Sequence, residues 1–241
     1  MTNVFQDVVK ICSENLLYNK EVLDYIVNER KISLNSINKF ELGLFPEDLR
    51  NLFDKISPED LRSAGLIFNS SSSKFQLNNL VMPIRDVYGN YIALVGRSML
   101  GDEERKSKNI VKYYNSVYKK RQHLFGLNFA KNSIIEKDVV YVVEGYFDVI
   151  SPHQNGFTNV VAVCGSFLTS RQVALLSRYT SNIVMIMDNE PTAQEKAQKF
   201  VEKNDFKNIN LTFHNPLINE KEKDIDEYLK EHTLDDLISL L

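Results

Sequence analysis

The first part of the chain is patterned for helices. Apolar residues such as Val8, Cys12, Leu16 and Ile26 recur at helical spacing in the first thirty positions. Further along, Ser57 is followed by a proline and two acids, which is typical of a helix start. The pattern therefore predicts a largely helical beginning.

The pattern then changes to strands. Residues 80–85 and 91–97 are rich in apolar and β-branched side chains, and they flank Gly89 and Asn90. Two such runs around a Gly-Asn pair predict a β-hairpin. The serine run 70–73 predicts a turn, and the polar, highly charged stretch 101–109 predicts an exposed loop.

After residue 137 the rhythm changes again. Short apolar runs occur at 139–143, 160–163, 183–187 and 209–213, and each gap between them is long enough for a helix. Such alternation predicts parallel strands in an α/β unit with a sheet flanked by helices. We therefore predict a mixed α+β subdomain over 1–134, followed by an α/β domain over 135–241.

Composition narrows the class of protein. The 241 residues are 43% hydrophobic and 25% charged, as in ordinary globular proteins. No apolar run approaches the roughly 18 residues of a membrane span, and the N-terminal residues lack the layout of a signal peptide. The two cysteines, Cys12 and Cys164, form neither a disulfide framework nor a CxxC zinc site. We therefore expect a cytoplasmic protein that does not contact membranes.

Charge is distributed unevenly. Residues 97–131 hold nine lysines and arginines against three acids, whereas residues 215–241 hold eight acids against three lysines. A basic middle beside an acidic end suggests one surface for phosphates and another for cations. Two solvated faces that merely differ in charge remain the alternative, and charge alone favours it.

Acidic residues stand where the predicted strands end. Glu144 follows the first strand of the second half, and Asp188 and Glu190 follow the third. Ligands of such sheets bind at the carboxyl ends of the strands. Acids at one edge repel each other unless a divalent cation binds between them. Two such ions suit phosphoryl transfer.

Further acids fit the same place. Asp148 lies one helical turn after Glu144, and Asp224 and Asp226 follow the fourth strand closely enough to close the site. Helix capping is an alternative explanation for each acid. For Asp148 or Asp224 alone that alternative is at least as good, but for the whole set a metal site is favoured.

These residues resemble a known family. Residues 142–149, Val-Val-Glu-Gly-Tyr-Phe-Asp-Val, resemble the glutamate motif of the Toprim domain in DnaG-type primases. Residues 188–190 and 223–226 are similar to its two later acidic motifs. Residues 82–86, 96–97, 112–116 and 118–127 follow the primase core in order and spacing, and this basic half is particular to primases.

The resemblance implies a fold, an activity and a site. The fold is a Toprim domain with a parallel sheet, and the activity is synthesis of short RNA primers on single-stranded DNA from ribonucleoside triphosphates. It implies two or more Mg²⁺ or Mn²⁺ ions, with a replicative helicase as a further partner. The implied catalytic residues are Glu144, Asp188 and Glu190, and the implied metal ligands are these three with Asp148, Asp224 and Asp226. The implied nucleotide and DNA contacts are Arg97, Lys112, Tyr113, Asn115, Lys119, Lys120 and Arg121.

The chemistry of the substrates agrees with these implied contacts, because triphosphate and DNA are polyanions that need basic residues beside the metals. Tyr113, Tyr114 and Tyr118 suit stacking on unpaired bases. For Tyr114 and Tyr118, packing on the core is an equally good interpretation.

The sequence also departs from the family pattern. Glu190 stands where the family usually has Asp, and Pro191-Thr192-Ala193 replaces the usual Arg-Ala-Gly turn. The zinc-ribbon, helical-bundle and helicase-binding domains are not found, so we expect a minimal, phage- or plasmid-like form. Two alternatives stay open: a Toprim-type nuclease, and a nucleic-acid-binding module whose catalytic site has decayed.

Overall fold

The computed structural model describes residues 3–165, 167–204 and 206–241. Its contacts divide the chain into two compact units. The first comprises residues 1–85 and 89–118, and the second comprises residues 86–88 and 119–241. Among the described residues, no helix is long and apolar enough to span a membrane.

The first unit begins with helices, as predicted. α1 (Val4–Tyr18) starts at Asn3, whose side chain accepts a hydrogen bond from the backbone N–H of Phe5, and it buries its apolar stripe. The other helical segments of this unit are α2 (Lys20–Asp24), η1 (Tyr25–Glu29), α3 (Leu34–Phe40), α4 (Arg50–Phe53), α5 (Pro58–Ser63), η2 (Lys74–Gln76) and α6 (Asp102–Ser107). Ser57 caps α5 at the predicted start.

An antiparallel sheet completes the first unit. Its strands lie in the order β1 (Gly43–Leu44), β2 (Leu80–Arg85), β3 (Tyr91–Arg97) and β4 (Tyr113–Asn115). β2 and β3 form the predicted hairpin. Phe45, Phe75, Val81 and Leu94 are buried together with the apolar face of α1, which forms the core of this unit.

One expectation for the first unit is wrong. The charged stretch 101–109 was predicted to be a loop, but it contains α6. The charges are ordered along this helix, with three acids in its first turn and Arg105 and Lys106 in its last turn. This order stabilises a helix because the acids face the positive end of the helix dipole and the bases face the negative end.

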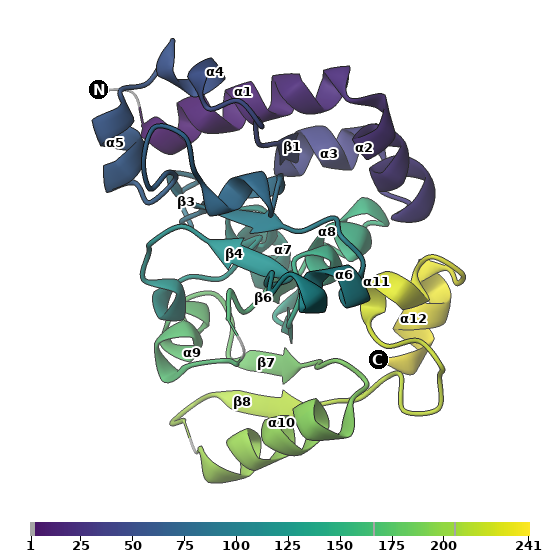
Figure 1. Cartoon of the computed structure of the whole chain (residues 1–241). Coiled ribbons are helices and arrows are strands. Elements are labelled where there is room, and N and C mark those ends of the chain that lie inside the picture. The colour runs from purple at the N-terminus through teal and green to yellow at the C-terminus, as the bar shows by residue number, and fades with distance from the viewer. Residues whose placement is uncertain (1–2, 166, 205) are drawn as a thin grey trace. The chain divides into compact units, whose positions relative to one another are not determined.

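A parallel sheet forms the second unit, and this confirms the predicted α/β fold class (Figure 1). The strand order is β6 (Val160–Ala162), β5 (Val140–Val143), β7 (Asn182–Met185) and β8 (Asn210–Phe213). All three strand pairs are parallel. Val140, Val142, Ile183 and Met185 are fully buried, as a sheet covered on both faces requires.

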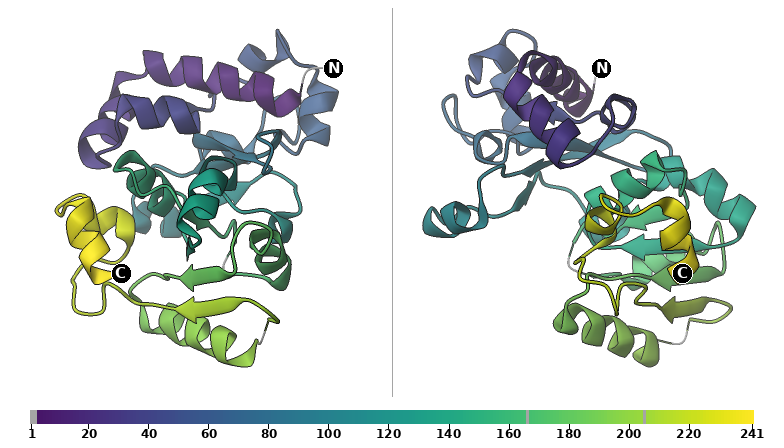
Figure 2. Two further views of the ribbon diagram at one scale, coloured as in Figure 1. Left: turned by 180° about the vertical axis from the view of Figure 1, so that it is seen from behind. Right: turned by 90° about the vertical axis from the view of Figure 1, so that its right-hand side faces the viewer.

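Helices flank this sheet. α7 (Leu127–Lys137) and α8 (Phe147–Gln154) pack against β6, and α10 (Pro191–Lys203) lies along β8, as Figure 2 also shows. The remaining helical segments are η3 (Lys120–Gln122), α9 (Ser170–Leu176), α11 (Ile225–Tyr228) and α12 (Leu234–Leu240). α11 packs against α8, which brings the end of the chain to the turn that follows β5.

The boundary between the two compact units comes earlier in the chain than the predicted boundary between residues 134 and 135. The division lies between residues 118 and 119, and α7 belongs to the second unit. Leu127, Ala130 and Ile134 of α7 are buried in the core around the parallel sheet. The basic half of the chain is therefore shared between the two units, which strand patterns alone did not indicate.

Candidate metal centre

Three acids of the second unit meet where β5 and β7 end. These strands are neighbours in the sheet, so the residues that follow them lie at one edge. Asp148, Asp188 and Asp224 each offer a carboxylate oxygen, and these oxygens lie within 4.8 Å of one another. We refer to these three residues as the strand-end cluster.

Glu144 belongs to the same place. It lines a small cavity together with all three residues of the strand-end cluster. The cavity volume is about 10 Å³, close to the smallest volume that holds one water molecule. The structure thus brings these four acids together, and their role as metal ligands stays a prediction.

The turn between β5 and α8 places Asp148. α8 begins at Phe147, so the carboxylate of Asp148 lies in the first helical turn, where it is almost fully buried. Gly145 stands directly beside it: a Cβ at this position would overlap Oδ2 of Asp148. The glycine after Glu144 is therefore required by the close approach of a carboxylate.

Asp224 and Asp226 come from the start of α11. The Asp224 side chain caps this helix by accepting from the N–H of Glu227 at 2.8 Å, so the capping interpretation and the cluster apply together. Asp226 is buried, and its backbone N–H donates to Oδ1 of Asp148 at 3.0 Å. Its Oδ2 lies 3.8 Å from Nζ of Lys230. The backbone of Asp226 thus positions the carboxylate of Asp148.

Burial and mutual repulsion disfavour negative charge at the cluster. Burial, followed by the nearby Asp188 carboxylate, raises the pKa of Glu144 to about 7. Burial and the charges of Asp224 and Asp226 raise the pKa of Asp148 well above its ordinary value. Burial also raises the pKa of Asp188, although Lys223 opposes this shift. Groups with this pattern bind a cation in exchange for protons.

Lys223 is the cation that the chain itself places at this site. Its Nζ lies 3.1 Å from Oδ2 of Asp188 and 3.1 Å from Oε1 of Glu190. Glu190 is about half exposed, precedes α10, and is held by this lysine at the rim of the site. The role of Lys223 was missed from the sequence, although the residue stands next to Asp224 in the acidic motif.

Comparison with known proteins agrees with this geometry. Residues 12–131 match the family model described as the DNA primase catalytic core, N-terminal domain, and residues 141–229 match the Toprim-like model. The DNA primase of Synechococcus elongatus is 33% identical over 236 residues, which cover 91% of this chain and 33% of that protein. The chain belongs to the DnaG-type primase family. It spans about a third of the length of the curated relatives that it matches.

Solved structures of the family share the fold. The Aquifex aeolicus primase, comprising its zinc-binding and RNA polymerase domains, superposes with a TM-score of 0.85 at 28% identity. That match covers 98% of this chain and 59% of the other. A DnaG primase catalytic domain bound to single-stranded DNA superposes with a TM-score of 0.78 at 22% identity, covering 98% and 81%. The predicted resemblance to DnaG-type primases is therefore confirmed.

The predicted basic contacts fall in both units of this primase-family chain. In the first unit, Arg97 and Tyr113 are paired across β3 and β4, and Nη1 of Arg97 donates to the Tyr113 hydroxyl at 3.2 Å. Nζ of Lys112 lies 5.9 Å from the centre of the same ring. Asn115 lies in β4. Arg97, Lys112 and Tyr113 therefore gather where β4 begins, and Asn115 lies at the other end of this short strand.

The other three basic residues lie in the second unit. Lys119, Lys120 and Arg121 are exposed at η3. Lys120 and Arg121 line a cavity of about 320 Å³ together with Thr169 and Gln172. The Gln172 side chain donates to the carbonyl of His123 at 2.7 Å, and the Thr169 hydroxyl donates to that of Arg121 at 2.8 Å. The basic segment is thus anchored through its backbone, which leaves its charged side chains exposed.

Tyr114 has a different role. Its ring packs edge-on against Phe75 with the centroids 5.1 Å apart. Phe75 is fully buried in the core of the first unit. The core-packing interpretation of Tyr114 is therefore favoured over base stacking.

Proposed function

We propose that this chain catalyses template-directed synthesis of short RNA primers on single-stranded DNA by metal-dependent nucleotidyl transfer. The observation that carries this proposal is the strand-end cluster, in which three carboxylates converge at the end of a parallel sheet in a chain of the DnaG-type primase family. The family model that matches residues 12–131 and the relatives found are DNA primases, which does not favour the nuclease or the decayed module.

The donor set fits hard divalent cations. Asp148, Asp188, Asp224 and Glu144 supply only oxygen atoms, and three of these acids have raised pKa values because burial and like charges disfavour their ionised forms. Mg²⁺ and Mn²⁺ prefer such ligands, and we propose that two or more of these ions bind here. When bound, such ions activate the attacking hydroxyl and stabilise the leaving oxygen.

The chain's own residues hold and balance this site. We propose Glu144, Asp188 and Glu190 as the catalytic metal ligands, with Glu190 at the rim of the site. Lys223 keeps Asp188 and Glu190 in place by contacting both carboxylates. Asp226 fixes the carboxylate of Asp148 through its backbone N–H. A cation that enters therefore meets oriented carboxylates.

The basic residues of both units are proposed to bind the polyanionic substrates. Arg97, Lys112, Tyr113 and Asn115 lie in or beside the β3–β4 pair, and Lys119, Lys120 and Arg121 are exposed at η3. Template and triphosphate each carry charges that such residues neutralise. A solved family member of the same fold is bound to single-stranded DNA, which supports the template assignment. A replicative helicase is a further proposed partner, which co-elution of the two proteins tests.

Primer synthesis can be tested directly. The chain is incubated with single-stranded DNA, four ribonucleotides and Mg²⁺ or Mn²⁺, and new RNA oligomers are measured. We expect Glu144→Gln to reduce synthesis by more than about 100-fold, because residues that merely support metal ligands already contribute 10–100-fold. Glu136→Gln removes an exposed acid of α7 and serves as the matched control, with activity unchanged.

The other outcomes are equally informative. Shortening of the template without new RNA would indicate a nuclease, and DNA binding without any product would indicate a decayed module. An active Glu144→Gln variant would remove Glu144 from the metal centre.

The basic assignment has its own test. Arg105 of α6 is paired with Asp102, and Lys108, which follows α6, is paired with Glu104 at 2.6 Å, so acids of the helix already neutralise both bases. We expect alanine variants of Lys112 and Lys119 to lower DNA affinity or primer yield, and those of Arg105 and Lys108 to change neither. Each lost phosphate contact should reduce the salt slope of binding by about one unit. Equal effects from both pairs would refute the assignment.

A further inference from the structure

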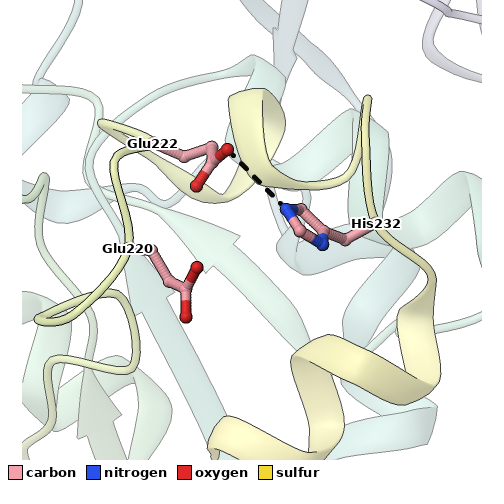
Figure 3. A group of neighbouring side chains, drawn as sticks. All are labelled: Glu220, Glu222 and His232. Carbon is pink, nitrogen blue, oxygen red and sulfur yellow. Dashed lines mark ion pairs between the residues drawn. The ribbon is translucent and has the colours of Figure 1, made fainter.

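A second group of possible cation ligands lies apart from the strand-end cluster in the second unit. Glu220 and Glu222 belong to the loop between β8 and α11, and His232 follows α11 (Figure 3). Each offers one ligand atom, and these atoms lie within 4.8 Å of one another. We call Glu220, Glu222 and His232 the histidine cluster.

Glu222 shows that this cluster is not satisfied by the protein alone. The residue is only 5% exposed, yet its Oε2 has no hydrogen-bond partner among the described residues. Its Oε1 lies 3.7 Å from Nε2 of His232, which is too far for a hydrogen bond. Figure 3 shows the carboxylate turned toward the other two side chains. Burying a carboxylate without partners is costly, so a ligand is expected to meet it.

Nearby lysines do not supply the missing charge. Lys223 contacts Asp188 and Glu190, and Nζ of Lys230 lies 3.8 Å from Oδ2 of Asp226. Within the described parts of the chain, His232 is the one basic group seen to pair with Glu222. Burial and the charges of Glu220, Asp236 and Glu222 raise the pKa of Tyr228. The surroundings of the histidine cluster are therefore negative.

The imidazole is held in place by Tyr228. The two rings are stacked with centroids 4.1 Å apart and an angle of 11° between their planes. The backbone N–H of His232 also donates to the carbonyl of Tyr228 at 3.0 Å. This stacking holds the imidazole where its Nε2 faces Glu222.

We propose that the histidine cluster is a second cation site, which binds a borderline transition-metal ion of the Zn²⁺ class through His232, Glu222 and Glu220. One imidazole nitrogen with carboxylate oxygens suits Zn²⁺, whereas Mg²⁺ takes oxygen ligands. Two ligand atoms about 2.1 Å from a tetrahedral ion are about 3.4 Å apart, so the observed 3.7 Å needs little adjustment. This site is independent of the proposed polymerase activity.

Occupancy would link two segments next to the strand-end cluster. The loop with Glu220 and Glu222 continues directly into Lys223 and Asp224, and His232 lies beyond α11. An ion that bonds to both sides fixes the loop and α11 to each other. The bound ion therefore stabilises the segment from which Lys223 and Asp224 approach Asp188.

The test is a Zn²⁺ titration of the whole chain in excess Mg²⁺, which saturates the oxygen-only site. We expect one tight equivalent of Zn²⁺, and an intense visible spectrum when Co²⁺ replaces it, typical of a site with few ligands. His232→Asn and Glu222→Gln should each weaken Zn²⁺ binding by at least about 100-fold. Even substitutions of residues that only hold the ligands in place lower metal affinity by roughly 10–100-fold. Glu220→Gln should weaken it less, because Glu220 is more exposed.

Two matched controls separate this site from its surroundings. Glu231→Gln removes an exposed acid next to His232, and Asp188→Asn alters the strand-end cluster. Both should retain the Zn²⁺ equivalent. Retention in His232→Asn and Glu222→Gln, or loss in Asp188→Asn, would overturn the proposal.

A second measurement uses the unaltered chain, so it does not depend on whether a variant folds. The chain has four histidines, so NMR of the imidazole signals during the Zn²⁺ titration should show one of them perturbed at one equivalent. No perturbed signal at one equivalent would contradict the proposal.

Discussion

The strand-end cluster and the histidine cluster lie in the same unit, but the negative charge of their acids is balanced by different groups. At the strand ends, Lys223 supplies a fixed positive charge to Asp188. In the histidine cluster, Glu222 faces an imidazole at 3.7 Å and its other oxygen lacks a hydrogen bond in the described structure. The strand-end cluster has only oxygen donors and a lysine beside them, whereas the histidine cluster adds an imidazole nitrogen. The two clusters are therefore expected to bind different cations.

The largest expected effect that separates them comes from Gly145→Ala. The new Cβ overlaps Oδ2 of Asp148, so the carboxylate must shift from its place in the strand-end cluster. We expect primer synthesis to fall by about 100-fold, whereas Zn²⁺ binding at the histidine cluster stays the same. Gly101→Ala is the control, because a Cβ there meets no neighbouring atom. Full activity of Gly145→Ala would show that Asp148 does not act in the cluster.

Lys223→Met tests the built-in counter-charge. Without the ammonium group, Asp188 and Glu190 repel each other, so the metal-free protein should lose on the order of 1 kcal/mol of stability. Mg²⁺ should then raise the unfolding temperature more than it does in the unaltered chain. Thermal unfolding with Mg²⁺ and with a chelator measures both effects. Lys221→Met, which removes an exposed lysine of the same loop, should match the unaltered chain.

The smallest effect concerns pH. The pKa of Glu144 is raised to about 7, so the folded chain binds more protons than the unfolded chain between about pH 4.5 and 7. Without metal, stability contributed by this group is present below that window and is lost as pH rises through it. Glu144→Gln should therefore be more stable than the unaltered chain at pH 8, by on the order of 1 kcal/mol after solvent screening, and not at pH 4. Chemical denaturation at the two pH values, with Glu231→Gln as control, checks this.

Much of the fold followed from the hydrophobic pattern. The apolar runs after residue 137 become buried parallel strands, because only a sheet covered on both faces hides such runs. The helix α6 was missed because its stability comes from the order of its charges, and it has no buried residue. The unit in which α7 packs could not be predicted from the hydrophobic pattern, because it depends on tertiary contacts.

The candidate site was predicted in outline. Glu144, Asp148 and Asp188 follow β5 and β7 in the sequence. Because these two strands are neighbours in the sheet, the three acids come together at its edge. The pairing of Lys223 with Glu190 could not be predicted, because it depends on side-chain direction in an irregular loop. Glu222 and His232 are ten residues apart in the sequence, and only the turn of α11 shows that they meet.

Asn189, between the two acids of its motif, connects both clusters. Its side-chain amide donates to the carbonyl of Leu217 at 2.7 Å and to that of Glu220 at 3.3 Å, and its backbone N–H donates to that of Lys223. Asn189, in the segment after β7, therefore helps to order the loop after β8 through both its side chain and its backbone. Ordering one residue's backbone costs roughly 1–2 kcal/mol of conformational entropy. Because Asn189 already restrains part of this loop in the folded chain, a cation at either cluster bears less of that entropic cost when it binds.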